Sequence, residues 1–283
     1  MENLVVRLAE SSKRSAARIL GVFLFAVLAL PGGTRASTPA PDEGRTIAVD
    51  GHRVAVRVVG HGRPAIVLIS GLGDGMATFQ AVARDLGRTH TVLIYDRAGY
   101  GGSDPGSGPR DASAAERELS GVLSQSGVAG PFILLGHSLG GLFAEYYAAK
   151  HPHQVSGLIL EDSRPADFTR RCAIALGASK CLPPAWSVWL MPKGARDEVA
   201  ALEQVVTQVE GSAPLRGKPV LVLSRAAAKS SPFVALWIQA QEDLAARYPG
   251  SRHVTAEAGG HYIHRDQRDW FLVSVRAFLK ELE

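Results

Sequence analysis

A serine between two glycines is the first feature of the chain that could do chemistry. Gly136-His137-Ser138-Leu139-Gly140 has the pattern G-x-S-x-G, and it lies between an apolar run and a helical pattern. In a strand–turn–helix the serine hydroxyl stands clear of the sheet, and the flanking glycines let the backbone approach without Cβ clashes. The helix N-terminus would also aim its amides at a developing anion. We therefore predict that Ser138 is a nucleophile; the alternative is a turn serine.

The elements that would position this serine alternate between short apolar runs and helical patterns. The apolar runs predict strands, the first two joined as a hairpin by an Asp-Gly turn, at 45–49, 52–60, 65–70, 91–96, 132–136, 157–162, 219–224 and 252–257. Helices are predicted at 76–86, 113–126, 139–150, 232–247 and 269–282. This alternation is typical of an α/β fold with a mostly parallel central sheet and helices on both faces.

Three further motifs make the chain resemble the α/β-hydrolase superfamily from about Arg45 to the C-terminus. SGLGDG (70–75) follows an early strand, where the family has its oxyanion loop, and YDRAGYGGSD (95–104) resembles the family's D-x-R-G-x-G-x-S loop. AGGHYI (258–263) follows the last strand, where the family has its histidine. The resemblance implies an α/β-hydrolase domain over 45–283, with a small cap insertion that we place at about 163–216.

The resemblance also implies which histidine serves as the base. A serine hydroxyl is a weak nucleophile at neutral pH, so a base must take its proton during attack. His261 fits the family order of serine, acid and histidine, and Gly259 and Gly260 free the loop before it. His264, three residues later, is the alternative.

The carboxylate that would orient this histidine is not where the family most often has it. The segment after strand 219–224 holds no carboxylate before Glu242 and Asp243. Some members instead carry the acid after the preceding strand, and there this chain has Asp162. We predict that Asp162 holds the histidine tautomer and stabilises the imidazolium. Glu161, Glu242 and Asp243 remain alternatives, and a loop-capping role remains open for Asp162.

Two backbone amides, of Leu72 and Leu139, are the expected oxyanion hole. The family usually has His-Gly in the first of these loops, and this chain has Ser70-Gly71. Because backbone donors do not depend on side-chain identity, the hole should survive that difference.

Other residues of these motifs are expected to be structural. His137 adjoins the serine, but consecutive side chains diverge, and His253 lies on a predicted strand. Asp96 and Arg97 are expected to brace loops by ion pairing. The glycine-rich loop at 70–75 lacks the G-x-G-x-x-G spacing because Met76 stands at the third position, which argues against a dinucleotide site. No metal or organic cofactor is implied.

The first 36 residues have the pattern of a secretory signal peptide. Four basic residues precede a 12-residue apolar run at 19–30, and small residues follow up to Ala36. As a helix this run reaches about 18 Å, short of a bilayer core. An uncleaved anchor or a structured helix is the alternative. Residues 37–44 are predicted to be a flexible lead-in. Cleavage would leave 26 basic and 25 acidic residues, with no basic run to suggest nucleic acid.

The insertion holds both cysteines of the chain, Cys172 and Cys181. An oxidising compartment favours a disulfide between them, and two buried thiols are the alternative. The insertion also carries a helical pattern at 195–211. Its aromatic residues Trp186 and Trp189 are expected to pack rather than to contact substrate.

These features together predict a secreted or periplasmic serine hydrolase that cleaves a carboxylic ester or a related acyl bond through an acyl-enzyme. The substrate would be a small molecule, and no membrane span is expected after signal cleavage. Acyl transfer to an alcohol on the same triad is one alternative. A non-catalytic binding protein on the same fold is another. The sequence does not specify the substrate or the oligomeric state.

Overall fold

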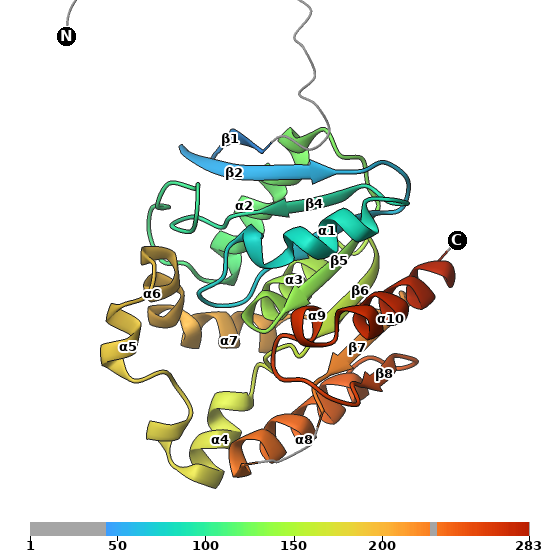
Figure 1. Ribbon diagram of the computed structural model, residues 1–283. Coiled ribbons are helices and arrows are strands. Elements are labelled where there is room, and N and C mark those ends of the chain that lie inside the picture. Colours follow the sequence, from blue (N-terminus) through green and yellow to red (C-terminus); the bar gives the residue numbers. More distant parts are fainter. Residues whose placement is uncertain (1–43, 227–230, 283) are drawn as a thin grey trace, which may run out of the picture. The chain divides into compact units, whose positions relative to one another are not determined.

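The computed structural model describes residues 44–226 and 231–282 (Figure 1). The predicted signal peptide, and all but the last residue of the predicted lead-in, lie outside the described residues. Among the helices of the described ranges, none is both long and apolar enough to cross a lipid bilayer.

Eight strands form one sheet in the order β1-β2-β4-β3-β5-β6-β7-β8. They are β1 (Arg45–Val49), β2 (His52–Val59), β3 (Ala65–Ile69), β4 (Val92–Tyr95), β5 (Phe132–His137), β6 (Val155–Glu161), β7 (Val220–Ser224) and β8 (Arg252–Thr255). The pairs β1–β2 and β2–β4 are antiparallel, and all other pairs are parallel. This sheet confirms the predicted α/β class.

The helices predicted outside the insertion are present, the first of them divided into η1 and α1, and several short helices occur besides. The elements are η1 (Met76–Phe79), α1 (Gln80–Leu86), α2 (Ala112–Ser126), α3 (Leu139–Lys150), α4 (Phe168–Leu176), η2 (Ala178–Lys180), α5 (Ala185–Trp189), α6 (Lys193–Ala200), α7 (Leu202–Glu210), α8 (Pro232–Ala246), α9 (Ile263–Asp266) and α10 (Arg268–Lys280). Helix α2 begins with a side-chain cap, because Asp111 accepts a hydrogen bond from the amide of Ala114, and it ends before Gly127 in the left-handed region.

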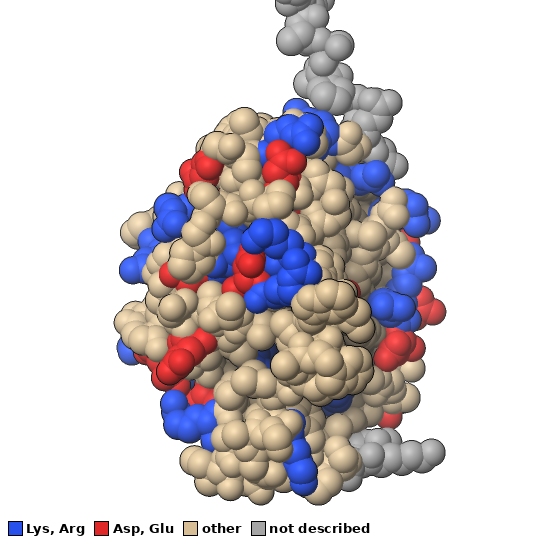
Figure 2. All heavy atoms as spheres, turned by 90° about the vertical axis from the view of Figure 1, so that its left-hand side faces the viewer, with Lys and Arg blue, Asp and Glu red and all other residues tan. Residues whose placement is uncertain are grey.

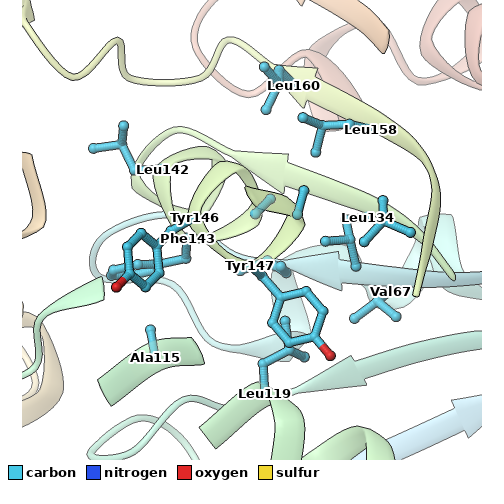
Figure 3. Close-up of a cluster of buried hydrophobic side chains, with 14 of the residues drawn as sticks. Val67, Ala115, Leu119, Leu134, Leu142, Phe143, Tyr146, Tyr147, Leu158 and Leu160 are labelled. Carbon is cyan, nitrogen blue, oxygen red and sulfur yellow. The ribbon is translucent and has the colours of Figure 1, made fainter. Parts of the chain in front are cut away.

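The core lies on both faces of the sheet, because alternate residues of a strand point to opposite sides. Val67 and Leu134 face α2 and α3, where they pack against side chains such as Leu119 and Leu142 (Figure 3). Ile66 of the same sheet faces the other way, into a cluster with residues of α1 and α10. Strands covered on both sides read as continuous apolar runs, which is why they could be predicted.

The register of the parallel strands brings three strand ends together. His137 of β5 pairs with Glu161 of β6, and Glu161 pairs with Leu223 of β7. Consequently Ser138, which follows β5, and Asp162, which follows β6, lie side by side at the carboxyl edge of the sheet.

The segment after β6 forms α4 to α7 and includes a satellite core. Phe168 and Cys172 of α4 pack with Trp237 of α8, and Figure 1 shows α4 beside α8. The structure confirms the disulfide between Cys172 and Cys181, which joins α4 to the residue after η2.

The helix predicted at 195–211 is wrong as a single element. The backbone leaves helical geometry at Ala201, which separates α6 from α7. The two halves bury different faces: Glu198 of α6 is enclosed with Arg97, whereas Val205 and Val209 of α7 join the main core. Neither glycine nor proline marks the break.

The expectation that the insertion's tryptophans pack is also wrong. Trp186 and Trp189 are 71% and 76% exposed, and α5, which carries them, buries none of its residues. A five-residue helix after two prolines has little surface to bury, and among the described elements α5 packs mainly against α6. Figure 2 shows the face on the side of α5 and α6, where basic and acidic side chains are mixed between large uncharged areas.

The disulfide should contribute measurably to stability. In the chain-entropy model, closing a loop of this length (sequence separation 9) stabilises the folded state by about 2–3 kcal/mol. We expect dithiothreitol to lower the free energy of unfolding of the wild type by that amount in urea titrations. The double variant Cys172→Ala/Cys181→Ala is the control, and its stability should not respond to the reductant. Equal unfolding midpoints of the wild type with and without reductant would contradict the prediction.

Candidate active site

Ser138 stands at a strained turn between β5 and α3. Its φ of 53° and ψ of −121° lie in a region that side chains rarely adopt, and such strain costs about 1–3 kcal/mol. The glycines of the motif make the turn possible. A Cβ on Gly136 would lie 2.5 Å from the carbonyl oxygen of Gly140, and a Cβ on Gly140 would lie 2.3 Å from that of Ile69. The turn is therefore held by close backbone packing on both sides.

The structure brings together the three side chains that the sequence singled out. His261 Nε2 lies 2.9 Å from Ser138 Oγ, and His261 Nδ1 lies 2.6 Å from Asp162 Oδ2. The imidazole thus bridges a hydroxyl and a carboxylate. With Nδ1–H donating to the carboxylate, Nε2 is left as an acceptor toward the hydroxyl.

The loop that carries His261 is fixed at several points. Gly259 has a φ of 92°, a conformation that favours glycine. The amide of Gly260 donates to Asp266 Oδ2 at 2.8 Å. His137 Nε2 lies 2.9 Å from the carbonyl oxygen of His261. His137 therefore has a structural role, because its side chain holds the backbone of the loop that carries His261.

Asp162 is fully buried, and its carboxylate is surrounded by donors. Arg225 Nε donates to Oδ2 at 2.7 Å, and the Arg225 amide and Trp237 Nε1 donate to Oδ1 at 3.2 and 3.0 Å. Arg225 Nη2 also lies 3.1 Å from His261 Nδ1. A buried carboxylate is costly unless it is paired and hydrogen-bonded, and here both conditions hold.

Sequence reasoning missed Arg225 and Trp237. A signal for the arginine was present, because Arg225 directly follows β7, where the superfamily most often has its acid. Since β7 pairs with β6, a side chain at that position can reach the carboxylate beside it. Trp237 lies within α8, and the sequence does not indicate which side of that helix faces the sheet edge.

The alternative residues are engaged elsewhere. Glu161 and His264 are buried and bond each other, with Oε1 at 2.8 Å from Nδ1. Asp243 pairs with Arg171 at the surface. Glu242 is exposed on α8.

His253, the other histidine expected to be structural, lies on β8, with Nε2 2.6 Å from Ser224 Oγ of the neighbouring strand. This contact joins β8 to β7.

The loop after β3, which holds the expected oxyanion amide of Leu72, packs directly on the serine. A Cβ on Gly71 would lie 3.2 Å from Ser138 Cβ. Leu72 and Leu139 line the same pocket as Ser138.

Arg97 braces this loop from behind. Its Nη1 and Nη2 donate to the carbonyl oxygens of Ser70 and Gly71 at 2.5 and 2.9 Å, and its Nε donates to Glu198 at 2.6 Å. The loop is thereby tied to α6 through a buried ion pair.

Asp96 braces the loops without an ion pair, which corrects the expectation for this residue. It accepts hydrogen bonds from the amides of Met76 and Gly102, at 2.6 and 2.9 Å. Two turns that follow neighbouring strands are thus joined through one carboxylate.

A pocket of about 430 Å³ opens over Ser138. Its walls combine apolar and cationic side chains from the sheet edge, the insertion and α8. The lining residues are Leu72, Ser138, Leu139, Arg164, Lys180, Cys181, Leu182, Pro183, Glu198, Val199, Leu202, Arg225, Phe233, Trp237 and His261. Trp186 and Trp189 are not among them.

Comparison with known proteins agrees with this architecture. Residues 64–180 match the family model described as the alpha/beta hydrolase fold. The uncharacterized protein YbdG of Bacillus subtilis is 30% identical over 122 residues, which are 42% of this chain and 38% of that protein. The chain thus spans well under two thirds of that relative.

Solved structures align over more of the chain. A hydrolase from Pseudomonas aeruginosa is 25% identical, with a TM-score of 0.59, over 83% of this chain and 98% of the other. The esterase EaEST from Exiguobacterium antarcticum is 21% identical, with a TM-score of 0.64, over 84% of this chain and 100% of the other. The chain therefore has the alpha/beta hydrolase fold, as these similar proteins do.

Acid should destabilise the protein through His137. Burial, partly offset by Glu161, lowers the pKa of this imidazole to about 3. Below pH 6.5 the unfolded chain binds a proton at this histidine that the folded chain does not. Stability is therefore lost as pH falls from about 6.5 toward 3, by up to about 1.4 kcal/mol per pH unit.

His137→Gln can keep a donor near the His261 carbonyl but cannot titrate. We expect its free energy of unfolding, measured in urea at pH 7, 5.5 and 4.5, to fall less steeply with acid than that of the wild type. Parallel pH profiles of the two proteins would show that His137 does not contribute.

Proposed function

We propose that the protein is an exported serine hydrolase that cleaves a carboxylic ester, or a related acyl bond, through an acyl-enzyme. The observation that carries the proposal is the continuous line from Ser138 Oγ through both nitrogens of His261 to the buried carboxylate of Asp162. In this proposal Ser138 is the nucleophile, His261 the base and Asp162 the acid that orients it.

Each step follows from these positions. Ser138 Oγ attacks the carbonyl carbon while its proton moves to His261 Nε2. The amides of Leu72 and Leu139 donate to the resulting oxyanion. As the intermediate collapses, Nε2 returns the proton to the leaving alcohol, and an acyl-serine ester remains.

The second half repeats the chemistry with water. His261 Nε2 takes a proton from water, the hydroxyl attacks the acyl-serine, and the proton then passes to Ser138 Oγ as the acid product leaves. Asp162 stabilises the imidazolium in both halves. Arg225 and Trp237 fix the orientation of Asp162 by donating hydrogen bonds to its carboxylate.

The disulfide and the N-terminal pattern support the export part of the proposal. Disulfides persist in oxidising compartments and are rare in the cytosol. The chain has one, Cys172–Cys181, behind an N-terminal segment of the secretory type.

Substitutions in the triad should abolish hydrolysis of 4-nitrophenyl esters. We expect Ser138→Ala and His261→Ala to lower kcat by about 10⁴-fold or more, and Asp162→Asn by about 10⁴-fold, because the wrong tautomer is then favoured. Release of 4-nitrophenolate from esters of increasing chain length measures this.

Asp243→Asn is the matched control, since this carboxylate pairs with Arg171 at the surface and should be dispensable for the rate. A fluorophosphonate probe should label the wild type but not Ser138→Ala. No labelling of the wild type, or labelling that persists in Ser138→Ala, would favour a binding protein. Ester products formed in the presence of alcohols would instead identify an acyltransferase.

Export should remove the N-terminal segment. Expressed in a bacterial host with a periplasm, the full chain should yield a mature protein that begins close to residue 37, because the small residues before that point suit signal cleavage. N-terminal sequencing of the periplasmic fraction measures this. An intact N-terminus on cytosolic protein would rule out export in that host.

A further inference from the structure

Arg164 lies beside the nucleophile without a role in the chemistry proposed above. It is two residues beyond Asp162, and its amide donates to the carbonyl oxygen of Ser138 at 3.0 Å. Its side chain lines the pocket that opens over Ser138. The position of the backbone therefore places a cationic side chain within the reach of a substrate held at Ser138.

The guanidinium of Arg164 is incompletely satisfied. Its Nε is buried and forms no hydrogen bond, and Nη2 bonds only to the hydroxyl of Thr169. The guanidinium carbon lies 5.5 Å from the centre of the Phe168 ring. Within 44–226 and 231–282, no carboxylate forms an ion pair with it. Burial lowers the pKa of Arg164 to about 10, which still leaves it charged at neutral pH.

The other charged residues around the pocket do not neutralise the positive charge of Arg164. Arg225 is paired with the buried Asp162. Glu198 lines the pocket, but Arg97 and the Tyr100 hydroxyl occupy its two oxygens. Lys180, the remaining charged lining residue, is an exposed cation. The pocket therefore presents an excess of positive charge over the serine.

We propose that the substrate carries a carboxylate close to its scissile bond, and that Arg164 binds this carboxylate. The inference rests on the proposed hydrolase function and names the substrate class. Arginine suits this task because its planar fork matches a carboxylate with two parallel hydrogen bonds. A bound carboxylate would supply the partner that the guanidinium lacks in the protein alone.

The remaining walls define the rest of the substrate. The other walls are apolar and are formed by Leu182, Val199, Leu202 and Phe233. The part of the substrate between and beyond the scissile ester and the carboxylate should therefore be hydrocarbon. A half-ester of a short dicarboxylic acid combines these features.

Two esters that share the same adipate chain test the inference. One is 4-nitrophenyl hydrogen adipate, with a free carboxylate, and the other is methyl 4-nitrophenyl adipate, in which that carboxylate is masked. We expect wild-type kcat/KM to favour the free acid by 10-fold or more, and Arg164→Gln to lower this preference by about 10- to 100-fold, the usual size of a charge-assisted interaction. Arg164→Lys should restore part of the preference, because it keeps the charge without the fork.

Arg196→Gln is the matched control, since Arg196 is exposed on α6 of the same insertion and does not line the pocket. It should leave the preference as in the wild type. Equal loss on both esters in Arg164→Gln, or no preference in the wild type, would overturn the inference. The absence of a preference in the wild type overturns the inference even where the variants fail to fold.

The two proposals fail in different ways. No hydrolysis of either ester, with no Ser138-dependent labelling by the fluorophosphonate probe, would contradict the proposed function. Efficient hydrolysis of both esters without discrimination would contradict only the role of Arg164.

Discussion

The site depends on the buried carboxylate of Asp162. A carboxylate without solvent must have its charge paired and its oxygens hydrogen-bonded, and this one draws its partners from separate parts of the chain. Arg225 follows β7, Trp237 lies in α8 and His261 lies in the loop after β8. Because the same oxygen accepts from Arg225 and meets His261, satisfying the buried charge also aligns the imidazole with Ser138. The site is therefore assembled only when the C-terminal part of the domain is folded against β6.

A second constraint is steric and concerns the neighbourhood of the serine. Gly71, Gly136 and Gly140 each stand where a Cβ would come within 3.2 Å of another atom, backbone for the last two. The strained Ser138 is thus surrounded by closely packed loops that leave no space for larger residues at these glycines. The side chains of Arg97 and Asp96 tie the loops after β3 and β4 together through hydrogen bonds to backbone groups. Ser138 therefore sits among loops that are tied to one another.

Much of this framework could be predicted from the sequence, because it obeys local rules. Apolar runs mark strands that are covered on both faces, and the glycine pattern marks the turn at Ser138. The choice of Asp162 over Glu161 depends on the strand's alternation, which sends Glu161 inward to His264. Arg225 and Trp237 were missed because their role depends on which elements lie side by side. The insertion was predicted least well: the break at Ala201 carries no local signal, and Trp186 is exposed because no other part of 44–226 and 231–282 covers it.

The placement of Asp162 and Arg164 has a consequence for how such a protein can diversify. Asp162 bonds the imidazole of His261, and Arg164, two residues later, lines the pocket. The start of the insertion is therefore held at the carboxyl edge of the sheet. The later wall, from Lys180 to Pro183, includes Cys181, which the disulfide joins to α4. Variation can therefore accumulate around Cys181 in that later wall and reshape what the pocket accepts, while the proposed nucleophile, base and acid keep their positions.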